Sequence, residues 1–168
     1  MKLKVGFIYG GISTEHEISV ISAVQAMNNV DKEKYEIIPI YISKNGEFYT
    51  GKDLLKIENY KNLKELCKKS NNVAIIKKGN EYCLLKVDFP HKILSTIDIF
   101  FPIVHGYNVE DGSIVGYLET IGAPYTESDL YASAVGQDKV IQKILFKENG
   151  IKVAPYIYFY ENDFINNE

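Results

Sequence analysis

Hydrophobic positions along the chain follow two periods, which predict strands that alternate with helices. Short apolar runs that end at glycine or polar residues are typical of buried strands, and apolar residues three or four positions apart are typical of one helix face. The expected strands are Leu3–Tyr9, Tyr35–Ile42, Ile97–Val104 and Tyr156–Tyr160. The expected helices are Thr14–Asn28, Asn59–Ser70, Ser113–Ile121, Leu130–Gly136 and Lys139–Asn149.

Two short hairpins interrupt this alternation. A turn signal at Lys44–Glu47 lets Glu47–Thr50 return as a short arm, and the turn Lys78–Asn80 separates the arms Val73–Lys77 and Glu81–Val87. The pattern predicts an α/β fold: a doubly wound, mainly parallel sheet with helices on both faces, to which the hairpins add small decorations. In such sheets ligands bind beyond the carboxyl ends of the strands. The loops that leave those ends are therefore the place to look for a site.

The polar segment GGISTEHEIS, residues 10–19, follows the first strand. Thr14 followed by Glu17 is a capping-box pattern, which predicts that Thr14 caps the next helix and that Glu17 completes the cap. Glu15 and His16 then stand in the first turn without a capping role. The helix dipole favours a carboxylate there by about 0.3–1 kcal/mol, so a structural role and a ligand-binding role for Glu15 both stay open.

The segment FFPIVHGYNVEDG, residues 100–112, joins an apolar strand directly to a polar loop. His105 follows the strand, and either Asp111 or Ser113 is expected to cap the next helix. Glu110 has no such local task. Because both polar loops leave strands at their carboxyl ends, we predict that residues 10–15 and 105–110 lie at the same edge of the sheet.

Other kinds of site find little support in the motifs. The pair Gly10–Gly11 lacks the rest of a nucleotide-binding glycine motif, so it indicates a tight turn whose N–H groups can also receive an anion. Glu15, His16, His105 and Glu110 are residue types that bind metals, but their spacing fits no metal motif, and we predict no metal site. No G-x-S-x-G nucleophile elbow is present.

Composition narrows the possible classes further. The chain of 168 residues is about one domain long, is 46% hydrophobic and has a net charge of −3 with no arginine. We therefore expect no nucleic-acid partner. No apolar run approaches the ~20 residues that span a bilayer, and no signal segment is evident. Cys67 and Cys83 have no metal or disulfide spacing, so we expect reduced thiols in a cytoplasmic protein.

The two polar segments, together with SIVGYLETIGAPYTESDLYASAVGQDK directly after the second, resemble the D-alanine–D-alanine ligase family in order and spacing over nearly the whole chain. The resemblance implies an ATP-grasp enzyme that joins two D-amino acids for peptidoglycan synthesis, through an acyl phosphate made from ATP. It also implies a Rossmann-like, pre-ATP-grasp N-terminal domain over residues 1–125. Residues 126–168 would then hold connecting helices and the start of a central domain, so that the chain is expected to be an inactive piece of a longer enzyme.

The resemblance also implies roles for individual residues. Glu15 matches the glutamate that binds the ammonium of the first D-alanine and is the expected catalytic residue. His105 and Glu110 match substrate-site positions, Glu110 as an orienting group, and Lys139 matches the lysine that reaches the ATP phosphates. ATP and Mg²⁺ are expected in the full-length enzyme, with none held by this chain alone.

Two departures from the family pattern affect these expectations. Val109 stands where the family has glycine, which predicts a strained or rebuilt loop if that position needs a positive φ, and Gln137 replaces a methionine. The second substrate, D-alanine, D-serine or D-lactate, stays open, as does a non-catalytic flavodoxin-like binding module. A homodimer through the N-terminal domain is a further expectation, because residues 113–121 offer more apolar surface than one helix face needs. These apolar residues are Ile114, Val115, Tyr117, Leu118 and Ile121.

Overall fold

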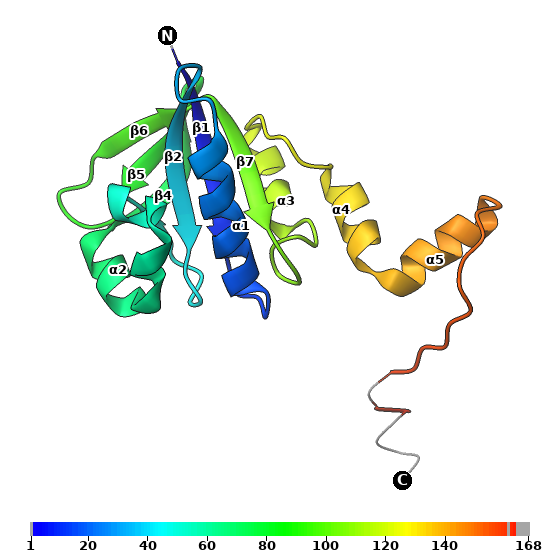
Figure 1. Cartoon of the computed structure of the whole chain (residues 1–168). Helices are drawn as coiled ribbons and strands as arrows, with labels where there is room; N and C mark the ends of the chain where they lie inside the picture. Colours follow the sequence, from blue (N-terminus) through cyan, green and yellow to red (C-terminus); the bar gives the residue numbers. More distant parts are fainter. Residues whose placement is uncertain (1, 161, 164–168) are drawn as a thin grey trace.

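The computed structural model describes residues 2–160, 162 and 163, and in this part of the chain the centre is a seven-stranded sheet of order β6-β5-β4-β3-β2-β1-β7 (Figure 1). The strands are β1 Leu3–Gly10, β2 Tyr35–Ile42, β3 Phe48–Thr50, β4 Asn71–Lys78, β5 Glu81–Lys86, β6 Ile93–Ile97 and β7 Ile99–Val104. Strand β1 pairs in parallel with both β2 and β7, whereas β3 to β6 join β2 through antiparallel pairs.

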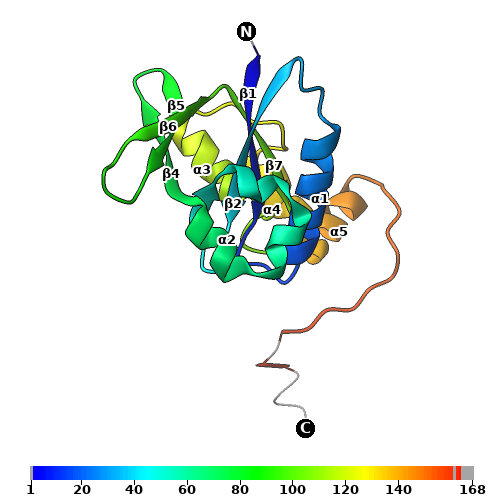
Figure 2. The same cartoon turned by 60° about the vertical axis from the view of Figure 1, so that its left-hand side comes forward.

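The predicted α/β class is confirmed, but the sheet is mixed and not mainly parallel, because only the pairs β1–β2 and β1–β7 are parallel. The two hairpins continue the sheet edge to edge beyond β2, and Figure 2 shows β4, β5 and β6 together at one side. The strand expected at Ile97–Val104 is interrupted at Asp98, which separates β6 from β7. Asp98 Oδ2 accepts the Lys4 N–H at 2.7 Å, so the residue between β6 and β7 is still hydrogen-bonded to β1.

Helices cover both faces of the sheet, as expected. The α-helices are α1 His16–Asn29, α2 Leu63–Lys69, α3 Ser113–Ile121, α4 Leu130–Gln137 and α5 Lys139–Glu148, and the 3₁₀ turns are η1 Lys52–Leu55 and η2 Ile57–Lys61. Phe7 and Tyr9 of β1 pack in a core with α1 and α2, whereas Ile8 packs in a second core with Leu118 of α3. Successive side chains of a strand point to opposite faces, so β1 is buried on both sides. None of the helices within the described residues combines the length and apolarity that crossing a bilayer demands.

Two predicted elements differ from the structure. The helix expected from Asn59 begins at Leu63, because Asn62 caps it by accepting the Glu65 N–H at 3.2 Å, and residues 57–61 form η2 instead. The strand expected at Tyr156–Tyr160 is wrong. Ile157 is 90% exposed, and an aromatic, β-branched run forms a strand only when it pairs and packs.

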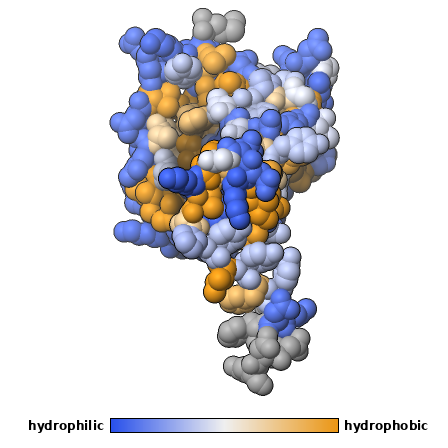
Figure 3. Space-filling model, turned by 90° about the vertical axis from the view of Figure 1, so that its right-hand side faces the viewer, coloured by the Kyte–Doolittle hydropathy of each residue, from blue (hydrophilic) through white to orange (hydrophobic). Residues whose placement is uncertain are grey.

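Helices α4 and α5 project away from the sheet in Figure 1. Leu130 at the start of α4 packs over Gly112 and Gly116, where a Cβ at Gly116 would lie 3.3 Å from Leu130 Cδ1, so these glycines allow the close approach of α4. Large apolar residues of α5 are exposed, and Figure 3 shows hydrophobic atoms spread over this side. The division of the chain at residue 125 stays a prediction, and residues 161 and 164–168 of its second part lie outside the described residues.

Candidate functional site

The loops after β1 and β7 leave the same edge of the sheet. The two strands are parallel neighbours whose last paired residues are Gly10 and Val104. Ser19, which is fully buried in α1, accepts the Gly10 N–H at 2.7 Å and donates to the Ile103 carbonyl at 2.5 Å. A single hydroxyl therefore fastens the first helix to both strand ends.

The glycine pair after β1 makes a tight turn. Gly10 has a φ of +87° and Gly11 a φ of +106°, a region that residues with a side chain rarely adopt. A Cβ at Gly10 would lie 2.3 Å from the Ile42 carbonyl oxygen, and the Gly11 N–H donates to that same oxygen at 2.8 Å. The pair is thus explained by the path of the backbone.

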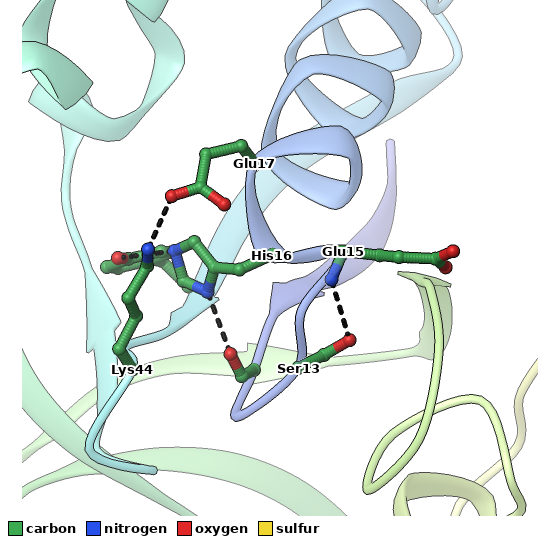
Figure 4. Close-up of polar contacts among 7 residues, drawn as sticks. Ser13, Glu15, His16, Glu17 and Lys44 are labelled. Atoms are coloured by element: carbon green, nitrogen blue, oxygen red, sulfur yellow. Dashed lines mark hydrogen bonds and ion pairs between the residues drawn. The ribbon is translucent and has the colours of Figure 1, made fainter.

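The predicted capping box is wrong. Helix α1 begins at His16 with Glu15 at the N-cap position and no side-chain cap, so Thr14 lies outside the helix and Glu17 is in its first turn. Glu17 instead forms an ion pair with Lys44, whose hydrogen bond lowers the pKa of the Glu17 carboxyl. The start of the helix is held by Ser13, whose Oγ accepts the Glu15 N–H at 3.1 Å (Figure 4).

His16 is a structural residue of the core. Its side chain is 1% exposed, with Nδ1 2.8 Å from the Gly11 carbonyl oxygen and Nε2 3.0 Å from the Tyr41 hydroxyl. A carbonyl oxygen can only accept, so Nδ1 carries a proton and donates to Gly11, while Nε2 pairs with the Tyr41 hydroxyl. Both ring nitrogens are occupied, which removes His16 from the candidates for ligand binding.

Glu15, His105 and Glu110 converge at one point. One ligand atom from each lies within 4.8 Å of the other two, with Glu15 and Glu110 exposed and His105 half-buried. Figure 4 shows the Glu15 carboxylate pointing away from the Glu17–Lys44 pair. The prediction that the two loops share one edge is therefore confirmed, while the roles of these residues stay predictions.

The second loop is held in shape by its own acidic residues. Glu110 Oε2 accepts the Gly106 N–H at 2.8 Å, and Asp111 Oδ2 accepts the Asn108 N–H at 2.9 Å. Asp111 Oδ1 also accepts from the N–H and hydroxyl of Ser113, the first residue of α3. Partial burial opposes ionisation of Asp111, but the Ser113 and Asn108 hydrogen bonds prevail and lower its pKa. The prediction that Asp111 or Ser113 caps this helix is wrong, because Gly112 occupies the N-cap position and no side chain caps it; Asp111 instead binds the first residue of α3.

Val109 is accommodated without the strain that its departure from the family pattern suggested. Asn108, with a φ of +67°, takes the left-handed conformation in its place. The Val109 side chain is 3% exposed and belongs to the core beside α3. A Cβ at Gly11 would lie 2.4 Å from Val109 Cγ1, so this valine fills the space that Gly11 leaves open between the two loops.

Replacing Val109 by glycine should destabilise the protein by about 2–4 kcal/mol, because it loses a buried valine and adds backbone freedom to the unfolded chain. The free energy of unfolding, measured with urea, checks this. Val87 is 45% exposed, and the matched variant Val87→Gly should cost about 1 kcal/mol or less. Equal losses in the two variants would contradict the packing role assigned to Val109.

Glu127 joins the site from outside the two predicted loops. It lines an open hollow of about 240 Å³ together with Glu110, Gly136 and Lys139. Loss of hydration, followed by the nearby Glu110 carboxylate, raises the pKa of Glu127, while His105 opposes the shift. No local pattern marks Glu127, because its position depends on the pairing of Tyr125 with Phe100.

Lys139 also lines this hollow, and its Nζ donates to the Gly136 carbonyl at 3.2 Å. It is exposed at the start of α5, and the side chain that caps that helix is Asp138, which accepts from the N–H groups of Val140 and Ile141 at 2.9 Å. The structure thus brings Lys139 to the same side of the molecule as Glu110. Its role toward ATP stays a prediction.

The arrangement favours a cationic ligand. Within residues 2–160, 162 and 163 the ion pairs are Lys34–Asp31, Lys44–Glu17 and Lys68–Glu65, and none of them involves the site. His105 Nε2 is buried and has no hydrogen-bond partner among the described residues. Two carboxylates and an imidazole are also donors of the kind that bind zinc, so the cluster could hold a metal, and the prediction that it holds none stays a prediction.

These features define the class of protein. It is an α/β domain with two carboxylates and one imidazole in the loops that follow the C-terminal ends of two parallel strands. A family model described as "D-ala D-ala ligase N-terminus" matches residues 4–128. The chain belongs to the D-alanine–D-alanine ligase family.

Individual relatives agree with this assignment. A D-alanine–D-alanine ligase of Thermosipho melanesiensis is 41% identical over 166 residues, which are 99% of this chain and 44% of that protein. The solved D-alanine–D-alanine ligase of Helicobacter pylori superposes with a TM-score of 0.82 at 28% identity, over 98% of this chain and 50% of that one. A D-Ala:D-Ser ligase of Enterococcus faecalis gives a TM-score of 0.77 at 28% identity, over 99% and 47%. The chain therefore spans about half the length of the relatives it matches.

Proposed function

We propose that this chain forms the N-terminal domain of an ATP-dependent D-alanine–D-alanine ligase and binds the first D-alanine. The observation that carries the proposal is the convergence of Glu15, His105 and Glu110 within 4.8 Å, without a cationic side chain paired to them among the described residues. An amino acid presents an ammonium group, and a carboxylate with no protein partner is a suitable acceptor for it.

Each residue of the cluster has a distinct task in this proposal. Glu15 accepts the substrate ammonium and fixes its position, and positioning of this kind can supply a large share of catalysis. Glu110 is held by the Gly106 N–H and keeps the loop shaped around the substrate. His105 offers its unpartnered Nε2 to the same ligand.

The full-length enzyme would use ATP with Mg²⁺, which supplies the phosphoryl group that activates the carboxylate of the first D-alanine. Lys139 is our candidate for a contact to the ATP phosphates, and its place beside Glu110 on one hollow supports this. Cytoplasmic location belongs to the same proposal, because ATP and cell-wall precursors meet there.

The apolar surface of residues 113–121, from which a homodimer was expected, is mostly covered within the domain. Val115 and Leu118 of α3 are buried, and Ile114 and Ile121 pack against the core beside them. Tyr117 donates its hydroxyl to the Ile75 carbonyl. The apolar residues of this helix are thus largely used within the domain, and a dimer stays a prediction that sedimentation at micromolar concentration would test.

The proposal is tested by assaying the full-length protein for phosphate release from ATP. We expect release that depends on D-alanine and yields D-alanyl-D-alanine, detected by mass spectrometry. Parallel assays with D-alanine plus D-serine or D-lactate identify the second substrate, a question that the likeness to a D-Ala:D-Ser ligase makes worth asking. A pure, folded full-length protein that releases no phosphate with any of these pairs would favour the non-catalytic module.

A further inference from the structure

The loop residue Ser13 joins the two halves of the site through one hydroxyl group. Its Oγ donates to the His105 carbonyl at 2.7 Å and accepts the Glu15 N–H at 3.1 Å. A serine hydroxyl has a single hydrogen. Because that hydrogen is directed to His105, a lone pair is left facing the Glu15 N–H, and the two bonds are compatible in this one arrangement.

The same contact depends on Gly106. A Cβ at this position would lie 2.6 Å from Ser13 Oγ and 3.3 Å from Glu15 Oε2, and Gly106 has a φ of +83°. The Glu15 carboxylate therefore lies directly over the backbone of the second loop. Ser13 Oγ lies against Gly106 beside this carboxylate, and its bonds to the Glu15 N–H and the His105 carbonyl link the two loops.

We infer that Ser13 is a positioning residue that fixes the Glu15 carboxylate relative to His105 for recognition of the substrate ammonium. The kinetic consequence of this inference rests on the proposed function. The physical link between the loops is independent of that function. Ser13 touches no reacting atom in this scheme. It acts through the Glu15 backbone, which it holds at the start of α1 in place of the absent side-chain cap.

Ser19 provides a matched control within the same motif. It also uses one hydroxyl to bridge β1 and β7, with bonds of 2.7 and 2.5 Å, but this hydroxyl binds Gly10 and Ile103. Ser19 reaches Glu15 only through its backbone N–H, at 3.0 Å from the Glu15 carbonyl, a bond that Ser19→Ala keeps. A general weakening of the link between the strands should therefore appear in Ser19→Ala. A specific loss of Glu15 placement should appear in Ser13→Ala alone.

The kinetic test is a double-mutant cycle in the full-length protein. Ser13→Ala should raise KM for the first D-alanine about three- to tenfold, the value of one net hydrogen bond, and leave KM for ATP unchanged. Ser13→Thr keeps the hydroxyl and should restore KM. In a Glu15→Gln background Ser13→Ala should add little, because its target is already lost, whereas the effect of Ser19→Ala should multiply with that of Glu15→Gln. Multiplicative effects of Ser13→Ala and Glu15→Gln would overturn the inference.

Amide hydrogen exchange in the full-length protein gives a second readout that needs no activity. Ser13→Ala should speed exchange in peptides covering both residues 13–19 and residues 103–109, and Ser13→Thr should not. Exchange that stays unchanged in the second segment would show that Ser13 does not couple the loops. If the wild-type protein proves inactive with D-alanine, the proposed function fails, and the exchange result still decides whether Ser13 links the loops.

Discussion

Glu15→Gln in the full-length protein should lower kcat/KM for the first D-alanine about ten- to a hundredfold. The substitution keeps the size of the side chain and a hydrogen-bond acceptor but removes the charge, and a charge-assisted hydrogen bond contributes roughly 1.5–3 kcal/mol. Affinity for ATP should barely change. The free energy of unfolding should change by less than about 1 kcal/mol, because the exposed Glu15 carboxylate makes no cap and only a dipole contact is lost.

Glu17 is the matched control for this variant. It lies two residues further along the same helix, and Figure 4 shows its carboxylate on the opposite side, paired with Lys44. An exposed ion pair contributes about 0–1 kcal/mol, so Glu17→Gln should leave both kinetics and stability nearly unchanged. If the kinetics depend on Glu17 and not on Glu15, the ammonium group binds beside Glu17, and the role assigned to Glu15 is wrong.

Gly10→Ala should destabilise the protein by about 3–5 kcal/mol, a large fraction of the 5–15 kcal/mol typical of a domain. Two penalties combine, because the φ of +87° strains any residue with a Cβ and the added atom would lie 2.3 Å from the Ile42 carbonyl oxygen. That oxygen belongs to the backbone of β2 and cannot move aside as a flexible side chain could. Urea denaturation of the full-length protein and of the variant measures the difference.

Gly79→Ala separates the two penalties. Gly79 has a φ of +60° in the turn between β4 and β5, with no atom within 4 Å of the position that a Cβ would take. Only the left-handed backbone then opposes the substitution, at a cost of about 1–2 kcal/mol. If Gly10→Ala costs no more than Gly79→Ala, the turn after β1 tolerates a side chain and the close approach to Ile42 has no energetic weight.

The elements around the site could be predicted because local pattern and tertiary position agree there. From Val5 onward β1 is buried on both faces and reads as a continuous apolar run, and the register of β1 with β7 follows from the parallel pairing expected of an α/β fold. That register brings Glu15 and His105 together. The surplus of acidic groups after each strand was therefore a sound indication of where the site lies.

The incorrect sequence predictions have one physical origin. Local propensity does not determine which distant residue a side chain or strand will contact. Thr14 and Glu17 match a capping box, but Glu17 finds Lys44 across the loop after β2. Residues 156–160 are rich in aromatic and β-branched types, yet they do not pair as a strand. Ser13 and Glu127 matter through contacts with segments distant in sequence, which no window of neighbouring residues reveals.

The position of β1 between β2 and β7 has a consequence for protein synthesis. Strands β1 and β2 with the helix between them are complete by Ile42, but the partner that aligns the second loop ends at Val104. Contacts between residues far apart in sequence form only after a costly loop closure. A growing chain on the ribosome can thus assemble the first β-α-β unit early, while the proposed ammonium site needs both loops and forms only when β7 inserts beside β1.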